Sequence, residues 1–136
     1  MALVGGGGAG NIAGGAPASA GKTLVTIADF AYAMSGLVQV TTNSNFLAFD
    51  TGNYLFVGTV QYMMGEDTTD NIVFETSMNG ETVTGALNEA AQAGNPQQPI
   101  PIIIPPYSKI SCDATNFTGV PTQRKCYCVI VGRIYA

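Results

Sequence analysis

The sequence predicts an all-β protein: an antiparallel β-sandwich of the jelly-roll type, preceded by a flexible Gly/Ala-rich N-terminal arm. After residue 23, short runs of β-branched and aromatic residues are separated by turn-forming Gly, Pro, Asn and Asp residues. Strands do not alternate with long helical patterns, which argues against a parallel sheet. The composition also changes at residue 23, because eight of the first 21 residues are glycine.

This break divides the chain into an arm, residues 1–23, and a sandwich domain, residues 24–136. The arm has no period of 2 or 3.6 residues, and it is too poor in large apolar side chains to offset the entropy of ordering by itself. We therefore expect it to be flexible unless a neighbouring subunit holds it.

Within the domain, apolar alternation predicts a series of short strands. The strand candidates are residues 24–27, 37–42, 46–49, 54–64, 72–78, 82–84, 100–104, 107–112 and 126–135. Residues 50–53 and the Asn79-Gly80 dipeptide are predicted turns, and Gly58 predicts a bulge or a close backbone approach. Residues 29–34 are expected to form a helical turn, since Ile27, Phe30 and Met34 would share a face, and residues 86–93 a short helix.

The charge content limits the partners. Only 10% of the residues are charged, against about 25% in an average soluble domain, and the net charge is −4. The five basic residues are scattered, so nucleic-acid binding is not expected. The longest apolar run, Ile102 to Ile104, is far too short to span a membrane, and no signal peptide precedes the domain, so synthesis in a cytoplasm and no membrane partner are expected.

The residues needed for catalysis are largely missing. The chain has no histidine, the commonest general base and metal ligand, so neither an enzyme nor a bound cofactor or metal is predicted. Residues 16–23 fit a relaxed phosphate-loop pattern, but they follow the arm and precede β-forming residues rather than a helix. Cys112, Cys126 and Cys128 are expected to be reduced, small, buried side chains.

Two segments are candidate contact sites. Residues 99–107 contain four prolines, which lack backbone donors, so this apolar segment must be a sheet edge or a crossover; it packs over the core or offers a docking edge. Together with the arm it predicts an assembly interface of Gly5, Gly6, Gly7, Gly8, Ile12, Ile102, Ile103, Ile104, Pro105 and Tyr107. The acidic loop with Glu66, Asp67 and Asp70 is a solvated turn, or a contact to calcium or to a basic partner.

The organisation of the chain resembles the small jelly-roll or β-sandwich proteins that decorate (cement) viral capsids, or serve as minor capsid proteins. The resemblance is carried by the arm before a sandwich, the 54–64 strand entering an acidic turn, the 102–107 segment and the final strand 128–135. It implies a structural subunit of the virion, assembled in the host cytoplasm as a homo-oligomer, taken as a trimer, on a major capsid protein or other particle protein. The alternatives are a carbohydrate- or receptor-binding module of a virion and a subunit of a non-viral filament.

Overall fold

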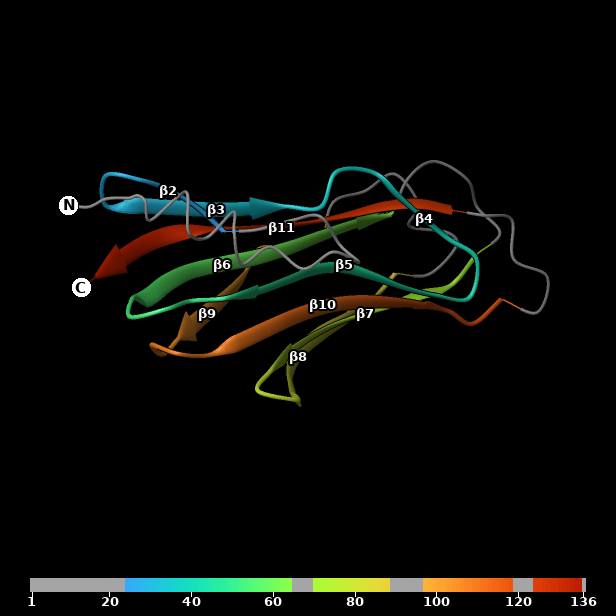
Figure 1. Cartoon of the computed structure of the whole chain (residues 1–136). Coiled ribbons are helices and arrows are strands. Elements are labelled where there is room, and N and C mark those ends of the chain that lie inside the picture. Colours follow the sequence, from blue (N-terminus) through green and yellow to red (C-terminus); the bar gives the residue numbers. More distant parts are fainter. Residues whose placement is uncertain (1–23, 65–69, 89–96, 119–123, 136) are drawn as a thin grey trace.

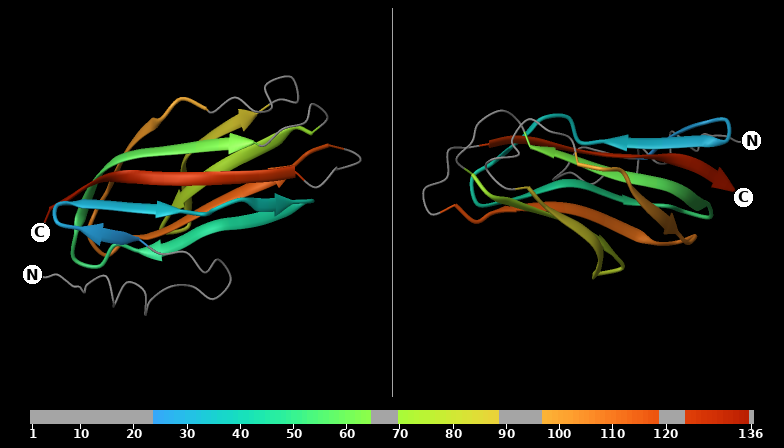
Figure 2. Two further views of the ribbon diagram at one scale, coloured as in Figure 1. Left: turned by 90° about the horizontal axis from the view of Figure 1, so that it is seen from above. Right: turned by 180° about the vertical axis from the view of Figure 1, so that it is seen from behind.

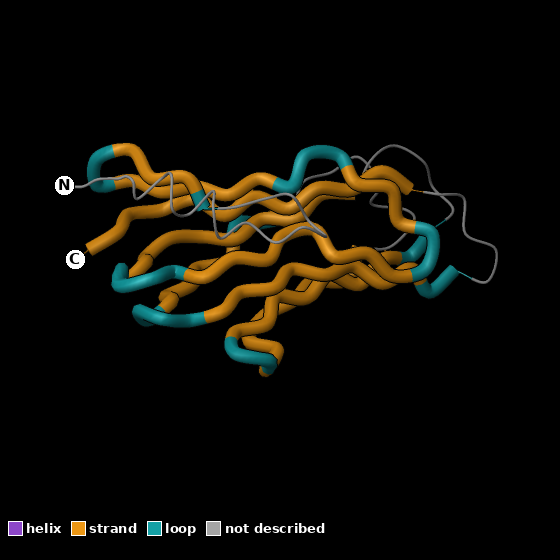
Figure 3. The backbone as a smooth tube through the Cα atoms, in the orientation of Figure 1, coloured by secondary structure: helices purple, strands orange, loops and turns teal. Residues whose placement is uncertain are grey.

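The computed structural model describes residues 24–64, 70–88, 97–118 and 124–135, and within these ranges every regular element is a β-strand (Figure 1, Figure 3). The predicted arm, residues 1–23, lies outside them. The strands are β2 (Val25–Ile27), β3 (Phe30–Met34), β4 (Val38–Val40), β5 (Asn43–Asp50), β6 (Leu55–Met64), β7 (Ile72–Met78), β8 (Glu81–Asn88), β9 (Ile100–Ile104), β10 (Lys109–Asn116) and β11 (Arg124–Tyr135).

The strands form two antiparallel sheets. One sheet has four strands in the order β5-β10-β7-β8, and the other has the order β2-β3-β11-β6-β9, with β4 continuing the line of β3 along β11. Figure 1 shows them as two layers, with β3 and β11 in one and β10, β7 and β8 in the other, and Figure 2 shows the strands running along the long axis of the molecule. The predicted all-β, antiparallel class is confirmed.

The core lies between the two sheets. Alternate residues of each central strand are buried, as in the pattern of β7, and residues of both sheets join one apolar cluster. Tyr62 of β6 stacks on Phe74 of β7 with ring centroids 5.1 Å apart, and Phe74 also meets Phe46 of β5. Aromatic pairs of this kind add about 1 kcal/mol beyond the burial of their area.

The two predicted turns are confirmed, and positive φ angles explain their residues. Asn79 (φ 53°) and Gly80 (φ 90°) connect β7 to β8, which is the backbone of a type I′ hairpin turn. Gly52 (φ 61°) turns the chain between β5 and β6. Thr51 links this turn to the loop before β10, because its hydroxyl donates to the carbonyl of Pro105 (2.9 Å) and accepts from the N–H of Ser108 (3.0 Å).

The predicted helical turn at residues 29–34 is wrong. Phe30–Met34 forms β3, which pairs with both β2 and β11. The chain reverses direction at Ala28, whose φ is +53°, so Ile27 and Phe30 are opposite one another across a hairpin rather than on one helical face. Tertiary pairing overrides the weak local preference.

The predicted short helix at residues 86–93 is wrong in its first three residues, which belong to strand β8; residues 89–93 lie outside the described ranges. The backbone of Phe74 and Glu75 on β7 pairs with Ala86 and Gly85 of β8, which holds this stretch extended. The prediction that residues 99–107 include a sheet edge is confirmed, because β9 is an edge strand of its sheet.

Candidate assembly surface

The predicted docking segment is only partly available to a partner. Ile102 and Ile104 are 7% and 0% exposed and belong to the core. The prediction that these two residues form part of an assembly interface is therefore corrected. The alternation of β9 turns Ile103 outward, where it is 62% exposed, and Tyr107 is 78% exposed in the loop that follows. Pro105 is also exposed. The arm residues Gly5 to Gly8 and Ile12 lie outside the described residues.

The acidic loop is likewise divided. Asp70 is fully buried and accepts a hydrogen bond from the Nδ2 amide of Asn116 (3.0 Å). This removes Asp70 from a solvent-exposed contact loop, because its carboxylate is used inside the protein. Glu66 and Asp67 lie outside the described residues.

The most distinctive surface is one that the sequence reading missed: the outer face of the six-stranded sheet. On β3, the small residues Ala31 and Ala33 are buried, whereas the large residues Phe30, Tyr32 and Met34 are 54%, 41% and 53% exposed. The neighbouring strands also expose large apolar side chains, although their buried positions hold large residues such as Phe56 and Ile130. We call this set the outer apolar face; its members are Ile27, Phe30, Tyr32, Met34, Val57, Ile103, Val131 and Tyr135, each 38% to 62% exposed.

The strand register makes this face continuous. One row crosses five of the six strands of the sheet through paired residues, in the order Ile27, Phe30, Arg133, Val57 and Ile103. In the next row, Tyr32 is opposite Val131. Directly opposite residues of an antiparallel pair have Cβ atoms about 5 Å apart, so these side chains touch or nearly touch. Soluble monomers rarely expose an apolar patch of this extent.

Charge is scarce on this face. Among the outward positions that the structure describes on these strands, only Lys125 and Arg133 are charged. The guanidinium of Arg133 is 5.1 Å from the ring centroid of Phe30, and one of its nitrogens is 3.8 Å from a carboxylate oxygen of Asp29. Arg133 lies in the middle of the row from Ile27 to Ile103, where Asp29 partly offsets its charge, whereas the next row, through Tyr32 and Val131, carries no charge.

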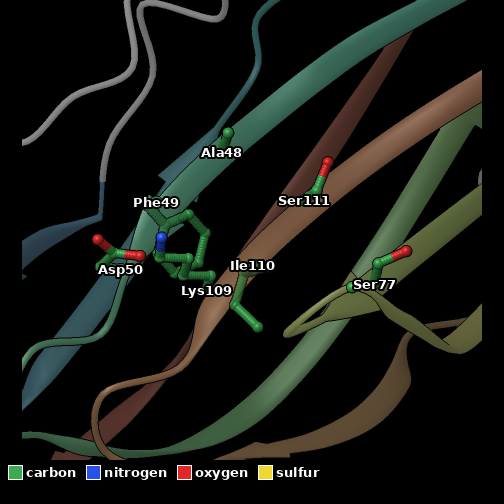
Figure 4. A pocket seen from close by; sticks show the side chains of 8 residues that line it. Ala48, Phe49, Asp50, Ser77, Lys109, Ile110 and Ser111 are labelled. Atoms are coloured by element: carbon green, nitrogen blue, oxygen red, sulfur yellow. The ribbon is translucent and has the colours of Figure 1, made fainter.

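The outer face of the four-stranded sheet has a different character. A hollow of about 310 Å³ lies where β5 and β10 meet the β7–β8 turn (Figure 4). Its polar lining groups are the carboxylate of Asp50, the amine of Lys109 and the hydroxyls of Ser77 and Ser111. Ligand sites are mostly lined by apolar and aromatic side chains, and the one aromatic residue here, Phe49, is 95% buried in the core. The hollow therefore gives little support to a carbohydrate-binding function.

The buried polar groups of the core form an internal network rather than a reactive site. The hydroxyl of Tyr62 hydrogen-bonds Thr76 Oγ1 (2.5 Å), which is in turn 3.2 Å from Cys112 Sγ. Burial raises the pKa of Tyr62 far above its ordinary value, and a hydrogen bond with Cys112, together with burial, raises the pKa of Cys128. Protonated thiols are poor nucleophiles, which agrees with the predicted structural role of the cysteines.

Neither a group of metal ligands nor a membrane-spanning helix occurs in the described part of the chain. No three His, Cys, Asp or Glu side chains are grouped there in a way that would hold a metal ion. No helix with the length and apolar character of a membrane span occurs in the same ranges. All three cysteines are buried, as expected, and none of them is part of a disulfide.

Comparison with known proteins adds no relative: no protein-family model, curated protein or solved structure matches this chain.

Proposed function

We propose that this chain is a structural subunit of a virus particle, a capsid decoration (cement) protein or a minor capsid protein. The observation that carries the proposal is the outer apolar face of the six-stranded sheet. An apolar surface that spans five strands is costly to leave in water, and a permanent assembly is the usual way to cover it.

The strand order supports assigning the jelly-roll type of sandwich, a fold used by viral capsid domains and by lectins. Taken from β3 onward, the first strands pair with the last: β3 and β4 with β11, β5 with β10, β6 with β9, and β7 with β8. Successive pairs belong alternately to the two sheets. A long antiparallel hairpin wrapped into two layers has this order. Fold alone does not establish function, so this is support by analogy.

The charge distribution favours a role on the shell rather than at the genome. Five basic residues against nine acidic ones leave the chain with a net charge of −4, and Arg133 is already matched by Asp29. Proteins that bind nucleic acid need clustered basic side chains to neutralise phosphates. In the proposed role the partners are further copies of the chain and a major capsid or other particle protein, reached in part through the arm, residues 1–23.

The proposal is tested by locating the chain in its source. Virus-like particles are purified on a density gradient from the biological source of the sequence. The proteins in the particle band are then quantified by mass spectrometry. A decoration or minor capsid protein is expected in the band in a fixed ratio to the major capsid protein. Absence from the particle band, with the chain found elsewhere in the material, would overturn the proposal.

A further inference from the structure

We infer that the outer apolar face of the six-stranded sheet is a self-association interface, covered in the assembled protein by a second copy of the same chain. The inference rests on the proposed assembly function and adds the identity of the partner. The eight residues of this face extend from Ile27 at one edge of the sheet to Ile103 at the other.

The size of the face matches what a stable pair of subunits requires. Its eight large side chains are about half exposed, and a large side chain offers roughly 200 Å². Together they present on the order of 800 Å², which is about the area that each partner buries in a protein–protein interface of standard size. The face is also the surface of a β-sheet, so a second sheet can pack on it at the usual spacing of about 10 Å.

The chemistry of the face suits a copy of itself better than a charged partner. At the centre, Val131 is flanked by Tyr32 and Thr59, none of which carries a charge. Arg133 is screened by Asp29 and Phe30. When two copies pack through this face, apolar side chains meet apolar side chains and no unpaired charge must be desolvated, which is the costliest term in interface formation. A partner chosen by charge would find only Lys125 and Arg133 among the outward positions described on these strands.

Sheets can also associate edge to edge, by pairing their edge strands. The β9 edge of this sheet is poorly suited to that mode of assembly. At this edge, β9 includes Pro101, which has no N–H to offer a neighbouring strand, and Pro99 directly precedes β9. Prolines on an edge strand are a common protection against edge-to-edge pairing. Packing through the face remains open where strand addition through β9 is blocked.

The test compares lysine substitutions at two valines whose exposed fractions are nearly identical. Val131 on the outer apolar face is 48% exposed, and Val83 on β8 of the other sheet is 47% exposed. The full-length chain, Val131→Lys and Val83→Lys are each measured by sedimentation velocity and light scattering over a wide concentration range. Circular dichroism and thermal unfolding check that each variant is folded, and Met34→Lys, 53% exposed on the same face, is a second probe in case Val131→Lys does not fold.

The expected result is a full-length chain with a defined multiple of the 14.1 kDa chain mass. Val131→Lys should weaken self-association by about 100-fold or more, since a lysine would be buried in each subunit without a partner. Val83→Lys should leave it within about 2-fold. A full-length chain that stays monomeric, or a multimer that Val131→Lys and Met34→Lys leave intact, would overturn the inference and assign the face to a different protein. Either result leaves the presence of the chain in the particle band, and so the proposed function, to be decided independently.

Discussion

Two glycines on neighbouring strands set how closely β6 approaches β11. Gly58 and Gly132 are register partners, and the ring of Phe56 lies against both. A Cβ added at Gly58 would collide with the carbonyl oxygen of Val131, with Gly132 Cα and with the ring of Phe56. The sequence left a bulge or a close approach open at Gly58; the register of β6 with β11 runs through this position without a shift, so it is a close approach.

We therefore expect Gly58→Ala to lower the free energy of unfolding by about 3 kcal/mol, because backbone atoms rather than a flexible side chain occupy the space. Gly80→Ala is the control: a Cβ there meets nothing within 4 Å, and only the left-handed backbone (φ 90°) opposes it, at a cost of about 1 kcal/mol. Urea unfolding measures both. Equal losses for the two variants would contradict the close-approach explanation.

At the scale of elements, a small polar network joins the two sheets. Tyr62 on β6 reaches across to Thr76 on β7, while Cys112 on β10 interacts with Cys128 on β11. The pKa of Tyr62 and that of Cys128 are both raised in the folded state. At high pH the unfolded chain loses the protons of Tyr62 and Cys128, whereas the folded chain retains them. The free energy of unfolding therefore falls as the pH rises through this range.

The contribution of these two groups to the free energy of unfolding should accordingly be independent of pH near neutrality and should decrease at alkaline pH. The decline begins near the ordinary thiol pKa of 9.0, steepens above the ordinary phenol pKa of 10.0, and continues toward the raised folded values. Each such group contributes a slope of about 1.4 kcal/mol per pH unit.

Tyr62→Phe should reduce the slope above pH 10.0, at a cost of about 1 kcal/mol near neutrality for the lost hydrogen bond. Tyr107→Phe, at an exposed tyrosine, is the matched control and should keep the wild-type slope. Urea unfolding across this pH range provides the measurement, and an unchanged slope in Tyr62→Phe would rule out this origin of alkaline sensitivity.

At the scale of the whole molecule, the outer apolar face shares its strands with the core, whereas the predicted arm, residues 1–23, precedes those strands in the sequence. The arm is rich in glycine and alanine and poor in large apolar side chains that could fill a core. The two sheets should therefore hold together without residues 1–22, whereas the proposed contacts of the arm with neighbouring subunits should not survive their removal.

Deleting residues 1–22 is expected to leave a single cooperative unfolding transition with a similar midpoint in thermal denaturation monitored by circular dichroism. The same truncation should abolish incorporation into the particle, measured by mixing the purified chain with particles that lack it and sedimenting them. Normal incorporation of the truncated chain would exclude an assembly role for the arm.

The sequence by itself determined the features that depend on local chemistry. The Asn79-Gly80 dipeptide predicted a tight hairpin, the prolines in residues 99–106 predicted a sheet edge or a crossover, and the short β-rich runs predicted antiparallel sheets. Each of these follows from what a single residue or dipeptide permits of the backbone, whatever surrounds it.

Only the tertiary structure decided which side of each strand is covered. Neighbouring residues of a strand point to opposite faces of the sheet, and this much follows from the sequence. The strands that cover one of those faces come from distant parts of the chain. Hence Ile102 and Ile104 are in the core while Ile103 is exposed, Asp70 is buried against Asn116, and the large residues of β3 face outward while its alanines face the core. The outer apolar face exists because the β2–β3 hairpin, β6, β9 and β11, which are far apart in the chain, bring such residues side by side, and no local pattern predicts this.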